Sequence, residues 1–167
     1  VLPMTQGALY VSTARVRIQA FLDAVNMSAD QLLIDLGCGD ARVLRSACRR
    51  YGVRAIGYEI NLLAYLKAYL LSLFHPKIRL KLSDFWRADI SRADVVFCYL
   101  YPDVLKRLSV KLRKELKPGA IVISGNFPLP GWTPIKVITC QRPLYNSPLY
   151  IYRNTRTQPN TSVADFK

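Results

Sequence analysis

A short apolar run that ends in a glycine-rich turn constrains the fold of this chain more than any other feature. Residues 32–36 are mostly apolar, and Gly37-Cys38-Gly39 follow them directly. Residues 41–51 then have the composition of a helix, which Gly52 ends. Because glycine has no Cβ, a turn of this kind between a strand and a helix lets a ligand approach the backbone closely. The segment therefore predicts a strand, a ligand-binding turn and a helix.

Helix and strand signals alternate along most of the chain. Helices are expected at residues 12–27, 41–51, 61–74 and 102–117, and strands at 32–36, 53–59, 78–82, 95–100 and 120–124. After residue 124 the alternation stops, and a Pro-containing loop joins two further strands, 135–139 and 149–152. This order predicts an α/β fold: a Rossmann-like, seven-stranded, mostly parallel sheet with a C-terminal antiparallel hairpin and helices on both faces.

Length and charge narrow the possible partners. We expect a single domain over residues 1–153 and a flexible C-terminal tail over 154–167, which is polar. The 24 Lys and Arg against 11 Asp and Glu give a net charge of +13, which favours nucleic acid, acidic protein or anionic lipid without choosing among them. The four cysteines form no CxxC pair, which argues against a zinc site, and no metal is expected.

Acidic side chains at the ends of three strands make the glycine turn a candidate cofactor site. Asp35 lies just before Gly37, where a carboxylate can hold a ligand ammonium. Glu59 ends the second strand about 20 residues after Gly39, where an acid can accept both ribose hydroxyls. Ser83-Asp84-Phe85 follow the third strand. There Asp84 can accept from an adenine amino group while Phe85 packs on the ring.

A dinucleotide site is the alternative for this turn, but its GxGxxG pattern is incomplete. Arg42 stands at the third glycine position, where it would crowd the close packing of helix on strand. Asp35 and Asp40 would also repel a pyrophosphate. A cofactor that carries an ammonium and a sulfonium fits the acidic turn better.

With these residues the chain resembles class I S-adenosylmethionine-dependent methyltransferases, whose first motif matches residues 35–42, Asp-Leu-Gly-Cys-Gly-Asp-Ala-Arg. Residues 8–13, 57–61, 83–86, 99–102, 115–120 and 127–134 are similar to a narrower group. That group is the small protein-lysine methyltransferases, which include archaeal enzymes and the mitochondrial ones acting on the adenine nucleotide translocase and the ATP synthase c-subunit. The resemblance covers residues 7–153. It departs at Ala41, where the group often has Gly, and at Tyr101, where the group varies.

This resemblance implies S-adenosylmethionine as cofactor, S-adenosylhomocysteine as its product, and methyl transfer to a protein lysine. The implied cofactor-binding residues are Asp35, Gly37, Cys38, Gly39, Glu59, Ile60, Ser83, Asp84 and Phe85.

A lysine acceptor needs an apolar, aromatic channel that favours the neutral amine by desolvation. The candidate channel residues are Tyr10, Tyr99, Tyr101, Phe127 and Trp132. Enzymes that methylate base amines carry Asn- or Asp-Pro-Pro-aromatic after the fourth strand, whereas this chain has Tyr-Leu-Tyr-Pro at residues 99–102. Cys98 follows Phe97 inside a predicted strand, so we interpret it as a core residue rather than as the nucleophile of a cytosine methyltransferase.

Two other functions stay open: an RNA or DNA methyltransferase, and a non-catalytic cofactor-binding module that binds nucleic acid or membrane. The stretch 61–74 carries leucines and aromatics around much of a helix, which suits a core helix, a dimer face or a peripheral membrane contact. We expect a cytoplasmic protein. Because the chain starts at Val1, membrane association through a segment that precedes it is a second expectation.

Overall fold

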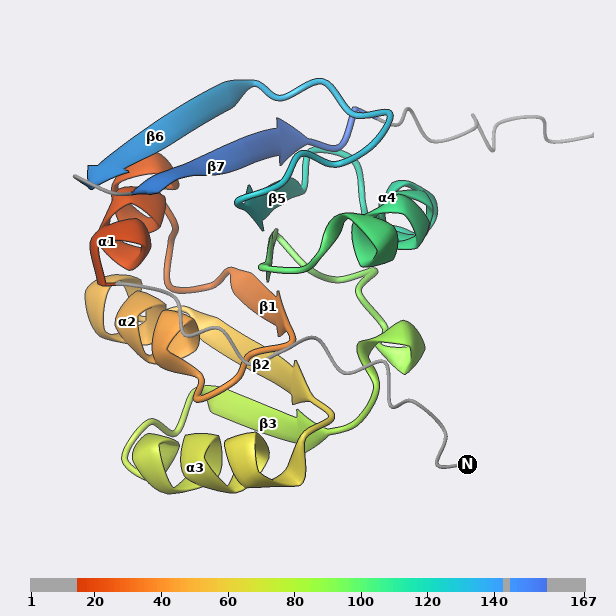
Figure 1. Ribbon diagram of the computed structural model, residues 1–167. Coiled ribbons are helices and arrows are strands. Elements are labelled where there is room, and N and C mark those ends of the chain that lie inside the picture. The colour runs from red at the N-terminus through yellow and green to blue at the C-terminus, as the bar shows by residue number, and fades with distance from the viewer. Residues whose placement is uncertain (1–14, 143–144, 156–167) are drawn as a thin grey trace, which may run out of the picture.

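The computed structural model describes residues 15–142 and 145–155, and the seven expected strands all lie there. Their bounds are β1 (Leu32–Leu36), β2 (Arg54–Glu59), β3 (Ile78–Leu82), β4 (Val95–Cys98), β5 (Ile121–Gly125), β6 (Lys136–Arg142) and β7 (Tyr145–Arg153). They form one sheet in the order β3-β2-β1-β4-β5-β7-β6 (Figure 1). The first five strands are parallel to one another, and β7 runs antiparallel to both β5 and β6. The predicted mostly parallel sheet with a C-terminal antiparallel hairpin is confirmed.

Burial along the strands follows their place in the sheet. The central strand β4 is Val-Val-Phe-Cys, and all four residues are buried. Such a continuous apolar run is expected where helices cover both faces of a parallel strand. The edge strand β3 instead alternates half-buried Ile78 and Leu80 with exposed Arg79 and Lys81. Strand burial therefore reports which strands lie at the centre of the molecule.

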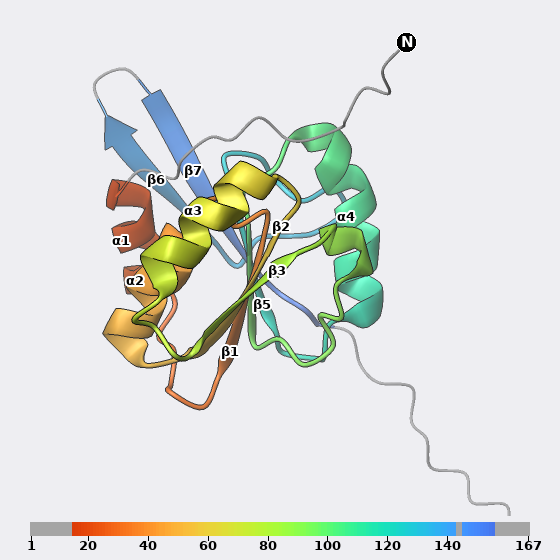
Figure 2. The same cartoon turned by 90° about the horizontal axis from the view of Figure 1, so that it is seen from below.

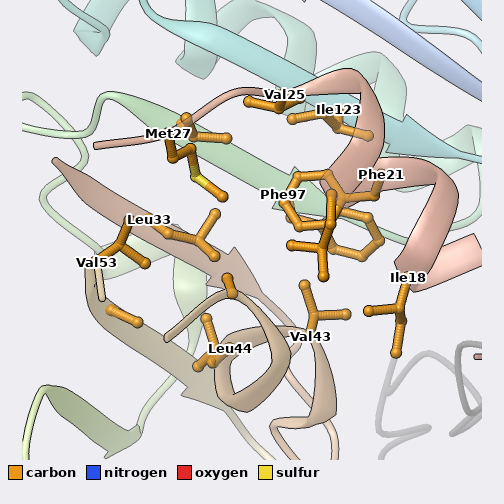
Figure 3. Close-up of a cluster of buried hydrophobic side chains, with 14 of the residues drawn as sticks. Ile18, Phe21, Val25, Met27, Leu33, Val43, Leu44, Val53, Phe97 and Ile123 are labelled. Carbon is orange, nitrogen blue, oxygen red and sulfur yellow. The ribbon is translucent and has the colours of Figure 1, made fainter. Parts of the chain in front are cut away.

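Helices cover both faces of the sheet, as predicted. The helices are α1 (Arg15–Ala24), α2 (Arg42–Tyr51), α3 (Leu62–Ser72) and α4 (Pro102–Glu115), with a short 3-10 helix η1 (Phe85–Arg87). Figure 2 shows α1, α2 and α3 on one side of the strands and α4 on the other. On the first side, Phe21 of α1 packs on Phe97 of β4 with ring centroids 5.4 Å apart, and Leu33 and Leu44 pack in the same cluster (Figure 3). On the second side, Leu105, Leu108 and Leu112 of α4 are fully buried.

Several boundaries differ from those expected: α1 ends at Ala24 rather than near residue 27, β4 ends at Cys98 rather than at residue 100, and α4 ends at Glu115 rather than at residue 117. Helix α3 ends at Ser72, and β6 and β7 extend until only residues 143–144 separate them. Asn154, which we placed in the tail, is instead 1% exposed. Its backbone pairs with Ala120, and its side-chain Nδ2 donates to the Leu116 carbonyl at 2.9 Å. Only residues 156–167 of the predicted tail lie outside the described residues.

The fold brings the predicted site residues to one edge of the sheet. Strand order reverses between β1 and β4, because β2 and β3 lie on one side of β1 and β5 lies beyond β4. Loops at the carboxyl ends of the strands around such a switch point form the ligand crevice of open α/β sheets. Asp35, Glu59, Tyr99 and Gly125 all lie at these ends.

Candidate functional site

In the glycine turn after β1, the backbone φ angle is positive at both glycines. Gly37 and Gly39 have φ values of +85° and +54°, in the left-handed region where a side chain is strained. The amides of Gly37 and Cys38 both donate to the carbonyl of Tyr58 at 2.9 Å, which ties the turn to the end of β2. Ala41 has φ +59° and is fully buried. Ala41, one of the two positions at which the chain departs from the resembling group, therefore has a backbone conformation that favours glycine.

Glu59 holds the turn and the start of α3 together. Its Oε2 accepts from the amide of Gly39 at 2.9 Å, and its Oε1 accepts from Ile60 at 2.9 Å and Asn61 at 2.8 Å. A carboxylate offers about four acceptor sites, so three bonds still leave capacity for a ligand hydroxyl. The sequence predicts only the ribose contact of Glu59, and the structure adds this backbone role.

Asp35 is a buried acid at the end of β1. The side chain is 2% exposed and lies beside the acids Glu59 and Asp40. Burial first, and then the like charges of Glu59 and Asp40, raise the pKa of Asp35 well above its usual value. A cation placed against this carboxylate would offset both effects. The site therefore fits the ammonium of S-adenosylmethionine.

The carboxylate of Asp40 is paired with two cationic side chains. Arg42 binds it through two nitrogens, Nε at 2.9 Å from Oδ1 and Nη2 at 2.6 Å from Oδ2, and Lys67 Nζ of α3 lies 3.7 Å from Oδ2. Arg42 thus binds Asp40. Contrary to the expectation from the sequence, it does not crowd the packing of helix on strand. These cations also compensate the negative charge of Asp40, which we expected to repel a pyrophosphate. The expected repulsion therefore depends on Asp35 alone.

The third group of predicted cofactor residues follows β3, beside the end of β2. Ser83 donates its amide to the carbonyl of Glu59 at 3.0 Å, which aligns the two strand ends. Asp84 Oδ1 accepts from the amide of Trp86 at 2.9 Å and so begins η1. Phe85 is half-buried and Ile60 is exposed, both next to these ends. An acid and two apolar side chains therefore flank the strand ends where the adenine was expected.

Of the five predicted acceptor residues, Tyr101 and Phe127 lie together after β4 and β5, whereas Tyr99 packs against a different hydrophobic cluster from Phe127. The rings of Tyr101 and Phe127 lie 6.4 Å apart. The Tyr99 ring lies against Gly125 so closely that a Cβ added there would be 2.3 Å from its Cδ2. Arg17 of α1 stacks over the same Tyr99 ring at 5.1 Å. Neither Gly125 nor Arg17 was predicted, because only the pairing of strands and the packing of α1 bring them to Tyr99.

The structure does not bring Trp132 to these aromatics. Its Nε1 donates to the carbonyl of Ser109 at 3.2 Å, and its ring packs edge-on against Tyr152 at 6.0 Å. Ser109 lies two turns along α4 from Tyr101, or about 12 Å at the usual rise per residue. Trp132 therefore packs α4 onto the sheet. Tyr10 lies outside the described residues.

The buried thiols do not supply a nucleophile. Cys98 is fully buried, and burial raises the pKa of its thiol to about 12, which confirms its interpretation as a core residue. Burial likewise raises the pKa of the Cys38 thiol, whose Sγ would lie 2.6 Å from a Cβ at Gly57. Among the described residues, no three His, Cys, Asp or Glu side chains gather as metal ligands would.

Comparison with known sequences matches residues 35–136 to the ANTKMT methyltransferase domain. The chain is 35% identical over 148 residues to a protein-lysine N-methyltransferase of Saccharolobus islandicus (strain REY15A), covering 86% of this chain and 91% of that protein. It is 38% identical over 116 residues to the adenine nucleotide translocase lysine N-methyltransferase of Mus musculus, covering 64% of this chain and 48% of the mouse protein.

Comparison with solved structures gives the same fold. An RNA methyltransferase from Salinibacter ruber, in complex with S-adenosyl-L-homocysteine, aligns with a TM-score of 0.82 and 28% identity over 90% of this chain and 97% of that one. A precorrin-6y C5,15-methyltransferase from Geobacter metallireducens GS-15 aligns with a TM-score of 0.67 and 18% identity over 87% of this chain and 91% of that one, which shows the fold alone.

Proposed function

Because the chain belongs to the family of ANTKMT methyltransferase domains, we propose that it transfers a methyl group to the side-chain amine of a protein lysine. The chain is an S-adenosylmethionine-dependent methyltransferase, as its family and its relatives are. The lysine acceptor rests chiefly on one observation. The likeness to the protein-lysine N-methyltransferase of Saccharolobus islandicus extends over 91% of that protein. The chain spans only about half of the mouse relative.

The proposed cofactor site lies across the ends of β1, β2 and β3. Asp35 faces the ammonium of the cofactor, and the backbone of Gly37, Cys38 and Gly39 approaches it without obstruction. Glu59 accepts from the ribose. The remaining contacts, to the adenine, come from Ile60, Ser83, Asp84 and Phe85. The buried carboxylate of Asp35 and the positive φ values of the glycines support this assignment.

Bound S-adenosylmethionine supplies a methyl carbon on a cationic sulfur, so the protein has chiefly to position the acceptor. A lysine ε-amine carries a proton in water and must lose it to solvent before it can act as a nucleophile. Apolar surroundings lower the pKa of an ammonium and so favour the neutral amine. Tyr99, Tyr101 and Phe127 provide aromatic surfaces at the ends of β4 and β5, beside the glycine turn.

Methyl transfer to RNA is the second candidate, since the Salinibacter ruber neighbour is described as an RNA methyltransferase and the net charge is +13. The aromatic stretch after β4 argues against a base amine as the acceptor. Tyr101 and Pro102 stand there, at the start of α4. No amide or carboxylate precedes them there to hold a base.

The test is transfer of radiolabelled methyl from the cofactor to cell fractions, followed by parallel digestion with protease and nuclease. We expect label that protease releases, and acid hydrolysis should yield methyl-lysine. Label released by nuclease alone would overturn the lysine proposal in favour of RNA or DNA. Asp35→Asn serves as the inactive control, and Asp89→Asn, at an exposed acid away from the strand ends, serves as the active one.

A further inference from the structure

Helix α3 presents its large apolar side chains to solvent. The residues that face the sheet are small and recur every fourth position: Ala64, which is half-buried, and Ala68 and Ser72, which are buried. The outer face of α3 consists of the exposed residues Leu62, Leu63, Leu66, Tyr69, Leu70, Leu71, Leu73 and Phe74. Leu63 is 77%, Leu70 64% and Phe74 94% exposed. A helix that packs only on its own sheet has the opposite arrangement.

The outer face is continuous and lies at one side of the molecule. Helix α3 packs beside β3, the last strand of the sheet, and Figures 1 and 2 show it as the outermost element there. Contiguous apolar patches of this kind mark interaction sites, because a solvated patch loses the free energy of burial. What binds this face must therefore supply an apolar environment.

Positive charge borders the outer face. A hollow of about 650 Å³ between α1, α2 and α3 includes Leu71 of the outer face. It is lined by five cations, Arg15, Arg42, Arg45, Arg49 and Lys67, and by one carboxylate, that of Asp40. In addition, the sequence from residue 60 to residue 82 contains no Asp or Glu. An apolar surface with a basic border matches the boundary between the acyl chains and the headgroups of an anionic bilayer.

We propose that the outer face of α3 binds peripherally to an anionic lipid bilayer, with the basic hollow over the headgroups. Helix α3 has 11 residues, or about 16 Å, against a hydrocarbon core of about 30 Å, so it lies in the interface. In the described part of the chain no helix is long and apolar enough to cross a bilayer. The inference does not depend on the lysine acceptor, because it concerns neither the cofactor site nor the aromatics.

Charge favours the bilayer over a second copy of the chain. A two-fold symmetric contact through α3 would place the same surface of both copies together. The basic hollow of each copy would then lie close to that of the other. Like charges brought together in this way oppose association, whereas anionic headgroups favour it.

The test is flotation of the full chain with vesicles, without any methyl acceptor. We expect the protein to float with vesicles of phosphatidylcholine that contain phosphatidylglycerol, and to stay behind with phosphatidylcholine alone. The double variant Leu70→Ser/Phe74→Ser should bind the anionic vesicles about tenfold more weakly or worse. Lys67→Gln should weaken binding about fivefold.

Matched controls come from α4, on the other side of the sheet. Val110 is 67% exposed, so Val110→Ser removes an exposed apolar side chain and should leave vesicle binding unchanged. Lys106→Gln, also exposed on α4, controls for net charge. The proposal would be overturned if Val110→Ser weakened vesicle binding as much as Leu70→Ser/Phe74→Ser does. Absence of flotation with anionic vesicles would also overturn the proposal. A further contrary outcome is a parent protein that sediments as a dimer, is dissociated by Leu70→Ser/Phe74→Ser, and binds vesicles in neither form.

A fluorescence measurement locates the contact independently. In Phe74→Trp, the added indole emission should shift to shorter wavelength on addition of anionic vesicles, relative to the parent protein with its two tryptophans. Val110→Trp should show no such added shift. A shift in Val110→Trp and none in Phe74→Trp would place the bilayer on the wrong face and overturn the proposal.

Discussion

Glu59, at the end of β2, accepts a hydrogen bond from the amide of Gly39 at 2.9 Å, and so one carboxylate joins two neighbouring strand ends. The same side chain binds the amides of Ile60 and Asn61, where α3 begins. The residue expected to hold the ribose therefore also fixes the turn that approaches the cofactor. Loss of this carboxylate should affect folding and binding together.

Glu59→Gln tests this double role. One amide oxygen can still accept, but the NH₂ group would meet an N–H donor on the other side. We expect a loss of about 1–3 kcal/mol in the free energy of unfolding, since a buried amide loses its partner. Cofactor affinity should fall as well. Thermal or urea unfolding and calorimetric titration measure the two effects. A variant with the same free energy of unfolding and the same cofactor affinity as the parent protein would contradict this double role of Glu59.

Asp35→Asn should stabilise the cofactor-free protein while it weakens cofactor binding. Folding raises the pKa of Asp35, chiefly by burial, so the folded state holds its proton more tightly than the unfolded state. By linkage, this contribution to stability is fully present below the unfolded pKa, near 3.8, and is lost as the pH rises through the raised, folded-state pKa. Asn has no proton to lose.

The variant should accordingly unfold at a higher temperature than the parent at neutral pH, and the difference should shrink toward pH 4. Unfolding midpoints measured across this range in the absence of cofactor decide the matter. Asp84→Asn, at an acid that is only half-buried, provides the comparison. A parent protein whose midpoint exceeds that of Asp35→Asn at neutral pH would contradict the argument.

The fold and the cofactor turn could be predicted from sequence because they depend on local signals. The bounds of β1 and β3 match those expected, since Gly37 and the Ile78-Leu80-Leu82 alternation define them within a few residues. The buried pairing of Asn154 with Ala120 and Leu116 has no such signal, because a polar residue at the start of a polar tail looks solvated until tertiary contacts are known.

The same limit applies to the site. The turn and Asp35 follow one another in sequence, whereas the neighbours of Tyr99 come from α1 and β5. Trp132, which lies five residues after Phe127, was grouped with the acceptor aromatics. The loop between them carries it to α4, where Ser109 offers a carbonyl to its indole N–H.

Gly125→Ala should disturb acceptor binding and leave cofactor binding intact. A Cβ at this position would lie 2.3 Å from Cδ2 of Tyr99, closer than atoms in contact allow, so the ring must move. We expect a raised KM for the protein substrate at an unchanged cofactor Kd. The double variant Gly125→Ala/Tyr99→Leu removes the clash and should recover stability lost by Gly125→Ala alone. Stability that the second substitution does not restore would show that the ring is not what the Cβ meets.

Tyr101 and Trp132 should respond in opposite ways to substitution. Tyr101 is 41% exposed and touches Phe127 at the strand ends, so Tyr101→Ala should raise the KM for the protein substrate several-fold with little change in stability. Trp132 bonds Ser109, packs on Tyr152 and lies under Arg113 at 4.5 Å. Trp132→Ala should therefore lower the free energy of unfolding by about 2–4 kcal/mol.

Denaturant unfolding and steady-state kinetics on both variants, at a temperature where each stays folded, separate the two roles. Arg113→Gln is a useful third variant, because it removes the cation over the Trp132 ring and the bond from its Nη2 to the Gly131 carbonyl without touching the indole. It should cost less stability than Trp132→Ala and leave the KM unchanged. A folded Trp132→Ala protein with parent-like stability and a raised KM would instead return Trp132 to the acceptor channel, in spite of its place against α4.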